Sequence, residues 1–299
     1  MTGPSTFLLS LLGCLWYYGT NVYGEPAKVN DGGPEAYIRR LTNDAEHLRI
    51  RDDENPLPDP GPEADFKLRS DYAATLVHRG DVKKAVEILE DIERRKPGEY
   101  VVAANLGTAY ELSGNNDKAL EWIRECLRRN KESHYGSEWL HIKILEAKIA
   151  LSKDPAWLRT HTVLGVDFGM EAVPSRPAKW TGDLAQRNVS GSIAYQLRER
   201  MAFVKAPDPV VGDLLVDLGN LTALEMTIEH AIAVYGLALT YQPVHADLVM
   251  KRREHLQGVL ADRRRRDLLK NLLFYAGGAV GVLGLGVFWT RVRRASGQK

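Results

Sequence analysis

Two neighbouring stretches of the chain repeat each other at a spacing of 34 residues. The first copy reads DYAATLVHRGDVKKAVEILEDIERRKP and the second reads NLGTAYELSGNNDKALEWIRECLRRNK. Three pairs of small residues correspond: Ala73 with Gly107, Gly80 with Gly114, and Ala85 with Ala119. This period is typical of a helix–turn–helix unit that buries its apolar side only against neighbouring units. The repeat therefore predicts stacked pairs of antiparallel helices.

Each copy carries the apolar spacing and the turn residues that two helices need. Large apolar residues recur at the i, i+3 and i+4 intervals of an amphipathic helix, for example Tyr72 with Leu76 and Leu89 with Ile92. Gly80-Asp81 and Gly114-Asn115 separate the helices. Glycine accepts the positive φ of a helix C-cap, and Asp or Asn begins the next helix.

The small and aromatic positions point to a known repeat family. Leu106-Gly107 is followed by Tyr110 and Ala119, and Pro97 closes the first copy. This pattern resembles the tetratricopeptide repeat. The resemblance implies an all-α fold, a solenoid of helical hairpins over 66–133 whose first helices line a concave groove. Proteins of this family bind a peptide or another protein there, so we expect a protein or peptide partner.

A degenerate third copy is predicted over 212–245. Leu218-Gly219 matches the first helix, Ala231 and Pro243 match the second, and Met226-Thr227 stands where the turn glycine is missing. The segment 134–211 does not fit whole repeats. We expect an insert there, with helices over 136–153 and 192–204 and an irregular Pro- and Gly-containing stretch between them.

The family resemblance also implies which residues face the groove. Carried over position by position, they are Ser70, Ala74, His78, Ala104, Asn105, Thr108, Glu111, Val216 and Asn220. One subclass of the family holds the C-terminal carboxylate of chaperones with a Lys and an Asn of the first repeat. Ser70 and Ala74 occupy those places here, and only Asn105 agrees, which argues against a chaperone-tail clamp. Taken singly, each position is more often a solvent-exposed polar site than a binding hot spot.

The C-terminal region predicts a membrane anchor. Residues 271–290 contain no formal charge, and this segment is long enough for a membrane-spanning helix. Aromatic residues stand near both of its ends. A buried core helix is the alternative. Gly277 and Gly281 have the GxxxG spacing through which two such helices would form a homodimer. A polar helix over 246–270 precedes the span, and a basic tail over 291–299 follows it.

The N-terminal region predicts a signal peptide over 1–24. Residues 7–19 are apolar over the length of a leader core, and Val22 and Gly24 supply small residues before a cut at Glu25. Against this, residues 1–6 contain no Lys or Arg. A helix and an acidic, Pro-rich linker are expected over 25–65.

The sequence allows two orientations of the large domain across a membrane. A leader would export the large domain and leave the basic tail in the cytoplasm. The excess of Lys and Arg over 251–270 instead favours a cytosol-facing, tail-anchored adaptor.

The sequence offers no catalytic constellation. The net charge of +1 gives no field that would attract nucleic acid, and two cysteines exclude a disulfide framework and a cysteine zinc site. The eight histidines are scattered without ligand spacing, so we expect no metal, no cofactor and no enzyme. The alternative is an enzyme with its site in 151–211, where Trp180, Asp183 and Arg198–Arg200 supply polar groups.

Overall fold

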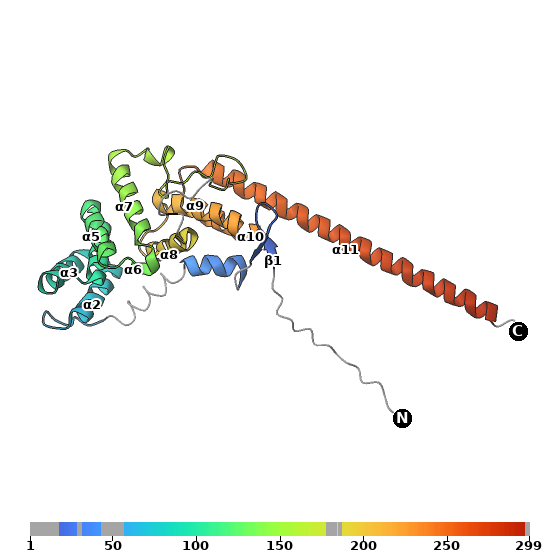
Figure 1. The fold of residues 1–299 in the computed structure, drawn as a ribbon, viewed down its shortest axis with the longest axis horizontal. Helices are drawn as coiled ribbons and strands as arrows, with labels where there is room; N and C mark the ends of the chain where they lie inside the picture. The colour runs from blue at the N-terminus through green and yellow to red at the C-terminus, as the bar shows by residue number, and fades with distance from the viewer. Residues whose placement is uncertain (1–17, 29–31, 43–56, 178–183, 185–186, 297–299) are drawn as a thin grey trace, which may run out of the picture. The chain divides into compact units, whose positions relative to one another are not determined.

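The computed structural model describes residues 18–28, 32–42, 57–177, 184 and 187–296, and the side chains of the last helix as far as 273. Helices account for most of these residues, which confirms the all-α prediction (Figure 1). The chain divides into two units, 1–253 and 254–299, which are considered separately.

Four helices of the first unit form two antiparallel hairpins over the two sequence repeats. Their bounds are α2 (Phe66–His78), α3 (Val82–Arg95), α4 (Tyr100–Leu112) and α5 (Asn116–Arg129). The Asp65 carboxylate caps α2 by accepting the Lys67 N–H at 2.9 Å, and Asn115 caps α5 through the Lys118 N–H at 3.2 Å. Gly80 and Gly114 make the turns with φ of +87° and +84°, a conformation that favours glycine.

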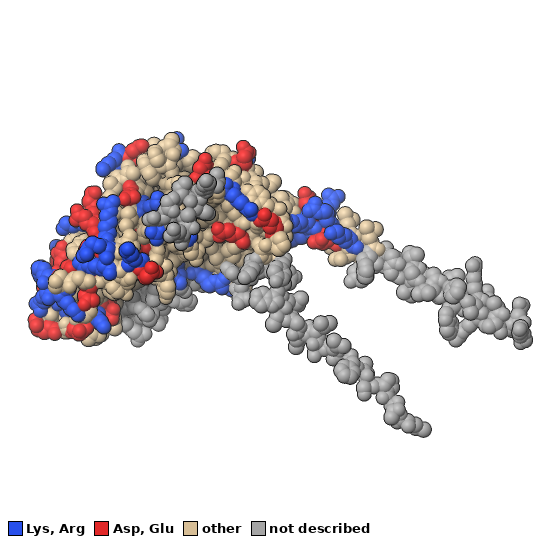
Figure 2. All heavy atoms as spheres, viewed as in Figure 1, with Lys and Arg blue, Asp and Glu red and all other residues tan. Residues whose placement is uncertain are grey.

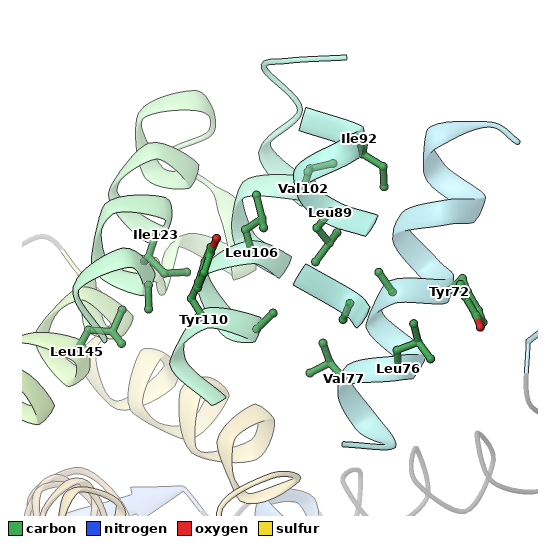
Figure 3. Close-up of a cluster of buried hydrophobic side chains, with 14 residues drawn as sticks. Tyr72, Leu76, Val77, Leu89, Ile92, Val102, Leu106, Tyr110, Ile123 and Leu145 are labelled. Carbon is green, nitrogen blue, oxygen red and sulfur yellow. The ribbon is translucent and has the colours of Figure 1, made fainter. Parts of the chain in front are cut away.

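The two hairpins share one apolar core, and α3 packs against α4 to join them (Figure 3). Leu89, Leu106 and Ile123 are fully or almost fully buried in it. Gly107 lies directly against Ile123, and a Cβ at position 107 would overlap that side chain. The glycine therefore sets how closely α4 and α5 approach.

The insert continues with helices that pack onto the hairpins. The helix α7 (Glu138–Lys153) lies against α5, and a short turn labelled α6 (Ser133–Gly136) precedes it. The 3-10 turn η1 (Trp157–Arg159) leads into an irregular segment, and α8 (Val189–Met201) follows. The predicted irregular stretch falls partly on 178–183 and 185–186, which lie outside the described residues, as do Trp180 and Asp183.

A third antiparallel pair is formed by α9 (Pro209–Glu225) and α10 (Ile228–Thr240), with Met226 and Thr227 between them. Gly219 packs on the ring of Tyr235, so this pair has the same close approach as α4 and α5. Asp213 of α9 accepts the Val163 N–H at 2.7 Å. Arg252 donates to the backbone carbonyls of Phe168 and Glu171, each at 3.1 Å. These buried ionic groups attach the irregular segment to α9 and to the start of the last helix.

The N-terminal end of the described chain forms a small hairpin. Strand β1 (Tyr18–Thr20) pairs antiparallel with β2 (Pro26–Lys28), with Gly19 opposite Ala27. Residues 33–42 are helical, and Tyr37 meets His230 of α10 edge to face at 5.8 Å between ring centroids. Of the leader predicted over 1–24, residues 1–17 lie outside the described residues, and of the helix and linker predicted over 25–65, residues 29–31 and 43–56 do.

The last helix, α11 (Ala246–Ser296), begins in the first unit and makes up the described part of the second. The predicted span 271–290 is helical in its backbone, but its side chains from 274 onward lie outside the description. Among the described residues, no helix is both long and apolar enough to cross a membrane. Figure 2 shows Lys and Arg interspersed with Asp and Glu on the visible surface.

Candidate binding cavity

A cavity of about 140 Å³ opens between the first helices of the two repeat hairpins and the insert helices. A volume near 150 Å³ is enough to hold a benzene ring. Four helices contribute to the wall, namely α2, α4, α7 and α8, together with the turn before α7. The polar and charged lining residues are His78, Asn105, Thr108, Glu111, His134, His141, Gln196, Glu199 and Arg200.

Glu111 of α4 is the centre of a buried ion cluster in this wall. Its carboxylate accepts hydrogen bonds from both terminal nitrogens of Arg200 on α8, one of them at 3.1 Å. His141 Nε2 lies 2.8 Å from the same carboxylate, and Lys148 Nζ donates to it at 2.8 Å. Glu111 is only 4% exposed, so these contacts compensate a charge that has left water.

The cluster extends through His141 to a second buried carboxylate. His141 Nδ1 lies 3.2 Å from Glu138 Oε2, and the other oxygen of Glu138 contacts His134 Nδ1. His134, Tyr135 and Gly136 all have positive φ, at 49°, 55° and 71°. Such a conformation is costly for the two non-glycine residues and persists only where surrounding contacts hold it. The strained turn thereby brings the His134 ring to the cavity wall.

The pKa shifts follow from this arrangement. Burial alone would raise the pKa of Glu111, but the charge of Arg200 and the hydrogen bond with His141 outweigh it and hold that pKa well below its usual range. Glu138 behaves in the same way: burial is outweighed by hydrogen bonds with His134 and His141, and its pKa falls to about 2. For His141, burial opposes the charged form, yet the two carboxylates raise the pKa above its ordinary value.

Apolar groups complete the opposite part of the lining. They are Ala74, Val77, Leu112, Phe203 and Val204. The rings of His78 and Phe203 are 4.7 Å apart between centroids, which joins the end of α2 to the residues that follow α8. The Nε atom of Arg200 is buried and has no hydrogen-bond partner within the described part of the chain. The cavity thus combines an apolar wall with a polar wall that includes Asn105, Thr108 and Gln196.

The structure places the nine predicted groove residues in three different settings. Five of them line the cavity: Ala74, His78, Asn105, Thr108 and Glu111. Ser70 is buried beside it and accepts the Asn105 amide at 3.0 Å, whereas Ala104 packs with Cys126 and Trp122.

The two residues predicted from the third copy are not at this cavity. Val216 does not line it, and Asn220 is buried, accepting hydrogen bonds from Tyr235 at 2.8 Å and from Arg252 at 2.7 Å. One expectation needs correction on physical grounds. Glu111, a predicted groove residue, lines the cavity, but its contacts with Arg200, Lys148 and His141 make it a buried ion and not a solvent-exposed polar position.

Several lining residues have no local signal in the sequence. His141 of α7 and Arg200 and Phe203 of the α8 region lie outside the repeats, so repeat periodicity does not place them in a groove. In the described part of the chain, no group of three or more His, Cys, Asp or Glu side chains has the arrangement of a metal site.

No family model matches the sequence, and no curated protein matches it significantly. The tetratricopeptide resemblance therefore depends on the 34-residue pattern itself.

Proposed function

We propose that this chain is a membrane-anchored binding module of the tetratricopeptide type that receives part of another protein in its cavity. The observation that carries the proposal is the location of the cavity. It lies on α2 and α4, the first helices of the two repeats, where the family resemblance expects a partner.

The insert restricts what such a partner presents. Residues of α8 and the segment after it form one wall, with Arg200 bonded to α4 and Phe203 stacked on α2. The remaining volume of about 140 Å³ suits one side chain of ring size better than a long extended peptide. We therefore propose that the cavity binds a single anchoring side chain, as interface hot spots commonly do in desolvated pockets.

The lining favours an anchor with an apolar body and a polar end. Val77, Leu112 and Val204 would contact the apolar part. The side chains of Asn105, Thr108 and Gln196 also line the cavity and would contact the polar end. A tyrosine, a glutamine or a methylated acid would meet both requirements.

The two carboxylates of the cluster are poorly suited to general-base catalysis, which supports binding as the function. A general base works best with a pKa near the operating pH. Here the pKa values of Glu111 and Glu138 are lowered, which makes both carboxylates weak bases, and their charges raise the pKa of His141. Burial raises the pKa of the nearby Cys126 thiol to about 11, which removes it as a nucleophile.

Attachment to a membrane through 271–290 is part of the proposal. Leu268, Leu269, Leu272 and Leu273 precede or begin that segment and are all more than half exposed. Four leucines within six residues of one helix are unfavourable in water, and a bilayer would cover them. With an export leader the large domain would lie outside the cytoplasm. The tail-anchored orientation is the alternative.

A peptide-display experiment tests the cavity. A random library is selected against the purified full chain in detergent, and the affinity of the enriched peptides is measured for wild type, Ala74→Trp and Glu121→Trp. Ala74 lines the cavity, whereas Glu121 is exposed on α5 and does not line it. We expect Ala74→Trp to weaken binding about tenfold or more, equivalent to ~1.4 kcal/mol.

The controls separate loss of a site from loss of folding. The melting temperatures of all three proteins are measured in the same detergent, and Glu121→Trp should bind as wild type does. Equal affinity of wild type and a folded Ala74→Trp for every enriched peptide would contradict the proposal.

A further inference from the structure

Residues 18–28 act as a structural part of the large domain. Strand β1 pairs with β2, and the turn between them is fixed by Asn21. The side-chain oxygen of Asn21 accepts the backbone N–H groups of Tyr23 and Glu25, both at 3.0 Å. The side-chain amide of Asn21 donates to Glu25 Oε2 at 2.7 Å. Asn21 is only 4% exposed, so this polar turn is packed against the protein.

The same turn caps the end of α9. The last four carbonyls of a helix have no partner within the helix and need one elsewhere. The Val22 N–H donates to the Ala223 carbonyl at 2.9 Å, and the Asn21 amide donates to the Leu224 carbonyl at 2.8 Å. Both carbonyls belong to the last turn of α9, nearly all of which is buried.

Further contacts attach the hairpin to other elements. Gly19 packs so closely on Thr227 that a Cβ there would overlap the threonine methyl group. The Tyr23 hydroxyl donates to the Pro174 carbonyl at 3.1 Å. Arg176 pairs with Glu25 and lies over the Tyr23 ring at 4.7 Å from its centroid. The hairpin thus joins α9, the α9–α10 turn and the irregular segment of the insert.

These contacts bear on processing of the chain. A peptidase cut between Gly24 and Glu25 would add water across that peptide bond and release β1 together with Asn21 and Val22. The helix α9 would lose two capping donors, β2 would lose its only partner strand in the described chain, and Asn21 would be separated from Glu25.

We infer that residues 18–28 belong to the mature protein, and that any export peptidase hydrolyses the chain before Tyr18. The inference is independent of the cavity and of its ligand. It assigns Tyr18–Val22 to the folded domain, so the apolar segment 7–17 directly adjoins that domain in the sequence.

The mature N-terminus decides the inference directly. The full chain with a C-terminal tag is isolated from membranes, its amino terminus is chemically labelled, and the labelled peptide and intact mass are measured by mass spectrometry. We expect a terminus at or before Tyr18, and recovery of peptides that cover 18–28. A terminus at Thr20, Glu25 or any other residue after Tyr18 would overturn the inference.

A stability measurement in the full chain tests the capping role separately. Asn21→Ala removes the Leu224 contact and the bonds within the turn, and we expect the melting temperature to fall by about 4–8 °C. Glu121 of α5 is exposed, so Glu121→Ala is the control and should leave the melting temperature unchanged. An Asn21→Ala protein that melts with wild type would overturn the capping role of Asn21, which is the physical ground of the inference.

Discussion

Arg200 and Glu111 are 89 residues apart in the sequence and form a two-point ion pair between α8 and α4. Both side chains are less than a tenth exposed. The pair connects the insert to the second repeat at the wall of the cavity, so the shape of the cavity depends on it. A buried ion pair of this kind adds little stability relative to apolar residues, but losing one partner is costly.

Replacing Glu111 by Gln should therefore destabilise the protein strongly. The variant keeps the shape of the side chain but leaves Arg200 and Lys148 without their counter-charge and removes one of the two carboxylates beside His141. We expect a loss of about 3–5 kcal/mol in the free energy of unfolding, measured by urea denaturation. Glu121→Gln, at an exposed position of α5, is the matched control and should change the free energy of unfolding by less than about 0.5 kcal/mol.

The ion cluster also predicts how stability depends on pH. The pKa of His141 is raised in the folded state, so its contribution is fully present below the ordinary histidine value and is lost as pH rises through the folded pKa. The pKa values of Glu111 and Glu138 are lowered, so their contribution is present above the ordinary glutamate value. It is lost as pH falls, towards about 2 for Glu138.

A His141→Gln variant isolates the alkaline limb of this profile. Its unfolding free energy should fall less steeply than that of wild type as pH rises from 6 to 9, while the acid limb remains. Denaturation in a series of buffers at constant ionic strength gives both limbs. Identical alkaline slopes for the two proteins would show that His141 does not titrate with folding.

Asp217 predicts a pH dependence of stability opposite to that of Glu111 and Glu138. Burial and the nearby Asp213 raise its pKa well above the ordinary value, and burial raises the pKa of Asp213 to about 6. One oxygen of Asp217 has no hydrogen-bond partner in the described chain. A raised carboxyl pKa favours the protonated form, so the native state loses stability as pH rises from the ordinary aspartate value to about 6 and beyond.

Asp217→Asn should therefore stabilise the protein at pH 8, by about 1 kcal/mol or more, and have a smaller effect at pH 4. Unfolding at both pH values measures this difference. Asp71→Asn on the exposed side of α2 provides the control for an Asp→Asn change at the surface. A loss of stability at pH 8 would mean that Asp217 is needed as an anion.

The two repeat hairpins could be predicted because their information is local. The spacing of small and large residues specifies both helices and their contact, and the turn glycines Gly80 and Gly114 mark the breaks. The N-terminal hairpin had no such signal. Its strands have three residues each, and the Asn21 amide finds its partner 203 residues away at Leu224. A leader-like composition then led to a cut being predicted inside a segment that the structure packs against α9.

The candidate site could be predicted only for the side that belongs to the repeats. The family pattern gave Ala74, His78, Asn105, Thr108 and Glu111, which all line the cavity. The other wall depends on tertiary packing of α7 and α8, and nothing in the sequence near Arg200 indicates that it pairs with Glu111. Because the sequence does not reveal the contact with Arg200, it does not predict that Glu111 is buried.

The close approach of α4 and α5 gives a further test. An Ala at position 107 adds a methyl group against Ile123, so the helices must separate or the isoleucine must move. We expect Gly107→Ala to cost about 1–3 kcal/mol in unfolding free energy despite the better helix propensity of alanine. Gly258→Ala provides the contrast because that position faces open space, and it should be neutral or slightly stabilising. Equal effects at both positions would argue against tight packing.

Removal of 271–290 should release the protein from membranes. Leu268, Leu269, Leu272 and Leu273 are exposed on α11, and the following charge-free segment is long enough to span a bilayer. Flotation of vesicles with the full chain, the deletion variant and a variant that lacks only 291–299 measures the attachment. We expect the full chain and the tail deletion to float and the span deletion to remain at the bottom. If the span deletion floats equally well, the anchor lies elsewhere in the chain. The apolar segment 7–17 would then be the next segment to delete.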